Sequence, residues 1–113
     1  MEKDCETKIP EQMKERLEKG GGLKGVAKNL QNDKEYTEKA KIHKALSDPN
    51  RLKILDMLSK QPLCVCIIKE ILKLPNSKLS YHLSILKENQ LIKGTRQNNW
   101  ITYEITEKGK KVL

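Results

Sequence analysis

Apolar residues recur at helical spacing in the segment that runs from Asn76 to Ile92. Leu79, Leu83 and Leu86 are spaced i, i+4 and i+7, which predicts a helix with one apolar face. Its first two turns carry short hydroxyl groups, a lysine and two flat rings, namely Ser77, Lys78, Ser80, Tyr81 and His82. A helix backed by leucines, with such side chains at its N-terminal end, is suited to enter the major groove of DNA. On this segment alone, an ordinary amphipathic surface helix is an equal alternative.

Two further helices are predicted before this segment. Tyr36, Ala40 and His43 lie on one side of a helix that ends near Ser47. Asp48 can cap the next helix, and a proline follows it in the first turn. That second helix ends before Gln61-Pro62, and its apolar residues are Leu52, Ile54, Leu55 and Leu58.

A continuous apolar run covers residues 63–68 and is extended by further aliphatic residues up to Leu74. Periodicity does not decide between a strand and a buried helix here, but residues 70–74 favour a helix. Pro75 breaks the chain, and we expect Asn76 to cap the leucine-backed helix that follows. Two helices joined by a short Leu-Pro-Asn turn predict a helix-turn-helix.

Two β-rich runs follow within residues 91–105 and flank a polar turn that contains Asn98-Asn99, which predicts a β-hairpin. Thr106 is the expected cap of a last short helix. This order of elements predicts a mainly α fold with a small β-hairpin, a winged helix-turn-helix. Arg96 at the hairpin tip and the nearby Lys93 would then hold the DNA backbone or the minor groove.

The first part of the chain has a different pattern. Residues 11–19 and 23–30 form two short amphipathic stretches, separated by the Gly20-Gly21-Gly22 run, and neither is long enough to be stable alone. The sequence therefore predicts an N-terminal extension over residues 1–32, which is either flexible or docks on a partner subunit. The DNA-binding domain is expected over residues 33–113.

Charge is distributed unevenly along the 113 residues. Residues 1–41 hold 10 basic and 9 acidic side chains, a balance of +1, and residues 42–113 hold 13 and 6, a balance of +7. The basic excess in the second part suits contacts with phosphates, and a merely solvated basic surface is the alternative. No apolar run approaches the roughly 18 residues of a membrane span, and the charged N-terminus is no signal peptide, so a cytoplasmic protein is expected. No nucleophile triad, phosphate-binding glycine loop or carboxylate pair indicates an enzyme.

Three motifs in this order resemble the ArsR-type (ArsR/SmtB) winged-helix repressors, which release DNA when they bind metal. Residues 44–55 are similar to the opening signature of the family, residues 63–66 to its metal-box motif, and residues 80–86 to its recognition helix. The likeness covers roughly residues 35–113. It implies a homodimer that pairs through its first and last helices and binds double-stranded DNA at an imperfect palindromic operator.

The resemblance also implies that Cys64 and Cys66 sense the inducer as thiolate ligands. Thiolates select soft ions such as As(III), Cd or Pb, and no cofactor is otherwise required. Arsenic-sensing relatives have a third cysteine where this chain has Lys69, and in cadmium- and lead-sensing relatives an N-terminal segment completes the site, a part that Cys5 could play here. The last helix lacks the histidine of the other metal site of the family.

The residues themselves leave the role of the cysteines open. In a regular helix, Cys64 and Cys66 would point about 200° apart, so sharing a metal needs a local distortion, which is available at a helix N-terminus. The two residues are otherwise small buried apolar side chains or a redox switch, and their direct pairing would be strained. His82 is expected to contact a base or a phosphate, and His43 to lie in the dimer helix or the core. A winged helix that binds no small ligand is the alternative function.

Overall fold

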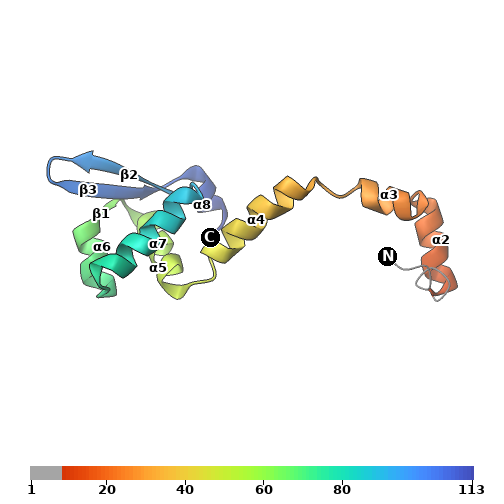
Figure 1. Ribbon diagram of the computed structural model, residues 1–113, viewed down its shortest axis with the longest axis horizontal. Coiled ribbons are helices and arrows are strands. Elements are labelled where there is room, and N and C mark those ends of the chain that lie inside the picture. The colour runs from red at the N-terminus through yellow and green to blue at the C-terminus, as the bar shows by residue number, and fades with distance from the viewer. Residues whose placement is uncertain (1–8) are drawn as a thin grey trace. The chain divides into compact units, whose positions relative to one another are not determined.

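The computed structural model describes residues 9–113. These residues form two short helices, followed by five helices and three strands. In chain order (Figure 1) these are α2 (Glu11–Lys19), α3 (Gly22–Lys28), α4 (Asp33–Ala45), α5 (Pro49–Lys60), β1 (Leu63–Cys64), α6 (Val65–Leu72), α7 (Asn76–Glu88), β2 (Ile92–Gln97), β3 (Trp100–Ile105) and α8 (Glu107–Lys111). The chain divides into two compact units between Thr37 and Glu38, within α4. None of the helices in residues 9–113 is long and apolar enough to cross a membrane.

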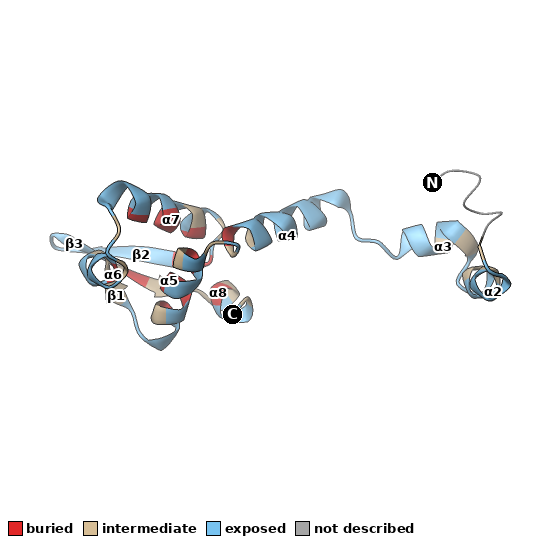
Figure 2. Ribbon diagram, turned by 90° about the horizontal axis from the view of Figure 1, so that it is seen from below, coloured by how far each residue is buried: buried red, intermediate tan, exposed pale blue. Residues whose placement is uncertain are grey.

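The described part of the N-terminal unit has no core of its own. Neither α2 nor α3 contains a buried residue, and Figure 2 shows both helices exposed or at most half-buried. Apolar side chains such as Met13 and Val26 are about half exposed, at 47% and 51%. Two short helices with unburied apolar faces gain little from folding alone, so α2 and α3 contribute little to the stability of the chain.

The core lies in the C-terminal unit and is built mainly from leucine and isoleucine, as expected for a chain without phenylalanine. Helix α7 presents its leucines to it, and the buried side of α7 is visible in Figure 2. The buried apolar residues are Ala45, Ile54, Leu55, Leu58, Ile68, Leu79, Leu83, Leu86, Leu91, Ile92 and Tyr103. The predicted apolar face of the helix that begins at Asn76 is thereby confirmed.

The sheet has three antiparallel strands in the order β1-β3-β2. Strands β2 and β3 form the predicted hairpin, and Asn98 adopts the left-handed conformation that its turn requires, with φ at 54°. The apolar run from Leu63 is both strand and helix. Its first two residues pair with β3, and α6 begins at Val65.

The predicted helix starts are mostly confirmed. The Asp48 carboxylate accepts from the backbone N–H of Asn50 at 2.8 Å, and Thr106 accepts from the N–H of Gly109 at 3.0 Å. Asn76 is the exception, because the structure makes it the first helical residue and Pro75 the N-cap, without a side-chain cap bond. Pro75 sets this start because its ring fixes φ, here at −58°, and ψ is extended at 151°.

Candidate nucleic-acid interface and thiol pair

Helix α7 separates its side chains into a buried and an exposed face. Leu79, Leu83 and Leu86 are at most 3% exposed and pack against the core. The opposite face of the first turns is exposed, and Tyr81 reaches 61%. Four predicted contact residues lie on this exposed side, Ser77, Lys78, Ser80 and Tyr81. Because the backbone of α7 is held by buried leucines, these four side chains project from a fixed support.

His82 lies on the other side of α7, contrary to the expectation that it contacts a base or a phosphate. Its side chain is buried, at 7% exposure, and its Nδ1 atom is 3.0 Å from a guanidinium nitrogen of Arg51. A ring that is enclosed and hydrogen-bonded inside the protein is not available to a groove. His43, in contrast, is exposed on α4 and does not belong to the core.

The turn that links α6 to α7 completes a helix-turn-helix. Helix α6 ends at Leu72, and its C-cap residue Lys73 has the left-handed conformation and donates its N–H to the carbonyl of Lys69 at 2.8 Å. Two residues later α7 starts after Pro75. Helix α5 contacts both α7 and β3, so the helix-turn-helix and the hairpin share one support.

Strand β2 of the hairpin is exposed beyond its first residue, whereas β3 contributes Tyr103 to the core. Ile92 is buried, and the following five residues of β2 are all exposed. Gly94 lies against the ring of Tyr103, and a Cβ atom at this position would come within 2.9 Å of that ring. Arg96 sits close to the tip, opposite Ile101, and has no ion-pair partner among residues 9–113.

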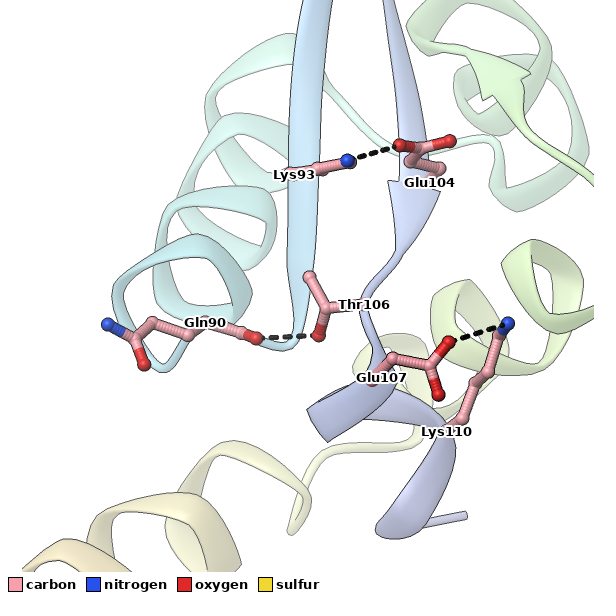
Figure 3. Close-up of polar contacts among 6 residues, drawn as sticks. All are labelled: Gln90, Lys93, Glu104, Thr106, Glu107 and Lys110. Carbon is pink, nitrogen blue, oxygen red and sulfur yellow. Dashed lines mark hydrogen bonds and ion pairs between the residues drawn. The ribbon is translucent and has the colours of Figure 1, made fainter.

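Lys93 is engaged within the hairpin. Its ammonium group lies 2.9 Å from the carboxylate of Glu104, the residue directly opposite on β3 (Figure 3), and this contact raises the pKa of Lys93. Figure 3 also shows Thr106, whose hydroxyl donates to the carbonyl of Gln90 at 2.7 Å and so ties the start of α8 to the end of α7. Of the two predicted wing cations, Arg96 is therefore the one without an acidic neighbour in contact.

Cys64 and Cys66 point toward each other, with their Sγ atoms 2.7 Å apart. In a regular helix the two side chains would point about 200° apart, but this angle does not apply here because Cys64 lies before the first residue of α6. It pairs with Thr102 in the sheet and is the extended N-cap residue of α6, at φ −76° and ψ 155°. Cys66 is exposed and Cys64 is half-buried, so the pair is accessible and is not part of the core.

The two thiols differ in acidity because each affects the other. The hydrogen bond from Cys66, helped by the N–H of Ile67, lowers the pKa of Cys64. The same bond raises the pKa of Cys66. Cys64 is therefore the first of the two to become a thiolate.

The donor set fits a soft ion but is incomplete within the described residues. Two thiol sulfurs on adjacent elements suit thiophilic ions. Residues 9–113 contain no group of three or more His, Cys, Asp or Glu side chains that could hold a metal. Cys5, the predicted third ligand, lies outside the described residues.

Two residues near the interface were not singled out from the sequence. Ser84 is exposed on α7 one turn after Ser80, and its position on the helical wheel could have identified it. Arg51 is buried against α7, and no local pattern indicates a partner 31 residues away.

A helix-turn-helix that shares one core with a β-hairpin wing defines the winged helix-turn-helix class. The family model described as "Bacterial regulatory protein, arsR family" matches residues 48–93. The chain is 40% identical over 73 residues to an HTH-type transcriptional regulator of Methanocaldococcus jannaschii. The aligned segment covers 64% of this chain and 82% of that protein. It is 39% identical over 70 residues to the arsenical resistance operon repressor of Staphylococcus xylosus, over 62% of this chain and 67% of the relative.

A solved structure supports the same assignment. The homodimeric winged helix-turn-helix DNA-binding domain of a possible ArsR-family transcriptional regulator from Mycobacterium bovis superposes with a TM-score of 0.61 and 26% identity. The similarity covers 72% of this chain and 78% of that one. The chain belongs to the ArsR family, and it is a transcriptional regulator and not an enzyme.

Proposed function

We propose that this protein is a homodimeric repressor that binds operator DNA through α7 and releases it in response to a thiol-reactive signal. The observation that carries the proposal is the division of α7 into a buried leucine face and an exposed face that bears Ser77, Lys78, Ser80 and Tyr81. Hydroxyl groups on a rigid helix suit hydrogen bonds to base edges, and the lysine suits a phosphate.

The wing would add phosphate contacts beside the groove that α7 enters. Arg96 is exposed and unpaired within residues 9–113, so its guanidinium is free to bind a phosphate or the minor groove. Lys93 would contribute less, because Glu104 already neutralises it. The role of α7 is thus to read sequence, and that of the wing is to add affinity.

A second copy of this chain is the proposed partner. A groove of about 430 Å³ lies between the end of α4 and the end of the chain, and Ile42, Leu46 and Val112 form its apolar part. First and last helices are where the family is expected to pair, and the Mycobacterium bovis relative is homodimeric. A dimer would present two copies of α7 to two half-sites of an imperfect palindrome.

The dimer is tested by sedimentation of two variants. Ile42→Asp puts a charge into the groove, and we expect it to dissociate the dimer. Ile71→Asp makes the same change on α6, at a side chain that is 56% exposed, and serves as the matched control. If Ile42→Asp sediments like the control and the wild type, this groove is not the dimer surface.

The Cys64–Cys66 pair is the proposed sensor. Its sulfurs face each other at an accessible position at the start of α6, the helix that precedes the DNA-reading helix α7. A soft ion such as As(III), Cd or Pb bound here would favour one arrangement of α6 over another and so change DNA affinity. Cys5 or a cysteine of a second copy would supply any third ligand.

Release of DNA by purified protein tests the whole proposal. A duplex selected by the protein from random-sequence DNA is the probe, and arsenite, cadmium, lead and an oxidant are added in turn. We expect at least one soft ion to release the duplex, and the double variant Cys64→Ser, Cys66→Ser to bind DNA without release. Release of the double variant would exclude the pair as the sensor, and release by the oxidant alone would favour the redox alternative.

A further inference from the structure

Arg51 is a buried cation that joins three helices. It belongs to α5, its side chain is 8% exposed, and all three of its nitrogen atoms make hydrogen bonds. Nε donates to the carbonyl of Ala45 at 2.6 Å, and a terminal nitrogen donates to the carbonyl of Lys44 at 3.4 Å. These carbonyls lie at the end of α4, where a cation is favourable. The carbonyl of Lys44 also accepts from the N–H of Ser47 at 3.2 Å and from its hydroxyl at 2.7 Å, so Ala45 provides the stronger contact with Arg51.

The third bond of Arg51 reaches α7. The other terminal nitrogen lies 3.0 Å from Nδ1 of His82. Because a guanidinium can only donate, Nδ1 of His82 is the acceptor of this bond. The described residues contain no fully buried side-chain nitrogen or oxygen without a partner, so the bond leaves neither Arg51 nor His82 with such an atom.

His82 is next to the exposed face of α7. The ring of Tyr81, one of the proposed reading residues, lies 5.6 Å from the ring of His82, with 56° between the ring planes. Arg51 and Tyr81 also line one cavity between α4 and α7, together with Lys41 and Lys44. The hydrogen-bonded pair therefore lies directly behind the side chains that α7 exposes.

Leucine packing holds α7 against the core, and the bond to His82 adds a directional contact to this support. Leu79, Leu83 and Leu86 belong to the apolar core, and apolar contacts are not directional. A hydrogen bond between two buried polar groups is directional and is costly to break. The link from α4 through Arg51 to His82 can thus select one rotation of α7.

We propose that Arg51 and His82 are positioning residues for DNA reading, which set the rotation of α7 relative to the end of α4. This inference rests on the proposed function of α7. The same end of α4 carries Ile42 and Leu46 of the proposed dimer groove, so the link connects that groove to the reading face. Neither residue contacts DNA itself.

The test separates sequence reading from DNA affinity. The measured quantity is the ratio of affinities for the selected duplex and for a scrambled duplex of equal composition. The double variant Arg51→Met, His82→Leu replaces both polar groups by apolar ones of similar size, which avoids an unsatisfied donor. We expect this variant to fold and to bind the scrambled duplex with the wild-type salt dependence. Its ratio of affinities for the selected and the scrambled duplex should fall about tenfold or more.

Three further variants make the outcome decisive. His82→Asn keeps an acceptor near the position of Nδ1 and should keep most of the ratio, whereas His82→Leu should lose as much as the double variant. Leu86→Met changes the same buried face without a polar bond, so it should lower the melting temperature but not the ratio. An unchanged ratio in the double variant, or an equal loss in His82→Asn and His82→Leu, would overturn the link.

Failure of the proposed function has a different signature. Tyr81→Ala should lower the ratio through a lost base contact, independently of the link. If Tyr81→Ala and all link variants keep the wild-type ratio, α7 does not read DNA and both proposals are wrong. If only Tyr81→Ala lowers it, the proposed function stands and the positioning role of Arg51 and His82 is wrong.

Discussion

Helix α7 and the wing carry the exposed side chains that we assign to DNA, but the two regions are supported in different ways. The exposed face of α7 has three leucines directly behind it, each at most 3% exposed. In β2, every residue after Ile92 is exposed, and the arm is supported mainly by its pairing with β3. Side chains that must match base edges need fixed positions, whereas a phosphate contact tolerates movement. The comparison assigns sequence reading to α7 and affinity to the wing.

The largest effect is expected from removing the support of α7. Leu83→Ala leaves a cavity behind the exposed face and should lower the free energy of unfolding by about 2–5 kcal/mol. Chemical denaturation followed by circular dichroism measures it. Ile101→Ala, at a wing residue that is 36% exposed, is the control and should cost much less. Equal losses would show that the wing is supported as firmly as α7.

The next effect concerns the cap of the helix that supports α7. Asp48→Ala removes the acceptor for the N–H groups of Asn50 and Arg51 and should cost about 1 kcal/mol of stability. Burial alone would raise the pKa of Asp48, but these N–H groups, with the charge of Arg51, hold it below its ordinary value of 3.8.

This lowered pKa gives the cap a definite dependence on pH. A depressed carboxylate pKa contributes stability that is fully present above pH 3.8 and is lost as the pH falls through the lower folded value. The stability difference between wild type and Asp48→Ala should therefore shrink in acid. A difference that stays constant from neutral pH to acid would contradict the assigned bond.

Charge removal tests the phosphate contacts that we assign to α7 and to the wing. Lys78→Ala and Arg96→Ala should each lower the slope of log affinity against log salt by about one, if each side chain binds one phosphate. Titrations at several salt concentrations provide the slope. An unchanged slope in either variant would remove that residue from the phosphate contacts.

The smallest effect should come from releasing Lys93. Glu104→Gln removes the carboxylate that lies 2.9 Å from its ammonium group, so Lys93 becomes free to bind a phosphate. We expect slightly tighter binding of scrambled DNA and a steeper salt dependence, with little change in stability because both side chains are exposed. Glu107→Gln is the control, since it breaks the exposed pair with Lys110 in α8. An equal gain in the control would indicate a general effect of net charge.

Local sequence patterns predicted the parts of the fold that depend on neighbouring residues. The leucine spacing gave the buried face of α7, Asp48 and Thr106 gave two caps, and Asn98-Asn99 gave the turn of the hairpin. His82 was misplaced because it borders the leucine stripe, where a histidine can be on either side. The hydrogen bond with Arg51 places the His82 ring on the buried side of α7, and that contact spans 31 residues.

The position of the thiol pair also depends on a contact between residues far apart in the sequence. An apolar run gives no sign that a strand ends at Cys64 and a helix begins at Val65, because pairing with β3 creates this boundary. The boundary is what brings Cys64 and Cys66 face to face. Their proximity therefore depends on a contact with a strand that follows almost forty positions later in the chain.

The central claim, that α7 reads sequence while the wing adds affinity, is tested most directly by comparing two variants on two duplexes. The double variant Ser80→Ala, Tyr81→Ala and the single variant Arg96→Ala are each titrated against the selected and the scrambled duplex. We predict that the α7 variant lowers the affinity ratio by about tenfold or more, and that Arg96→Ala weakens both complexes equally. An unchanged ratio in the α7 variant, or a reduced ratio in Arg96→Ala alone, would contradict the account.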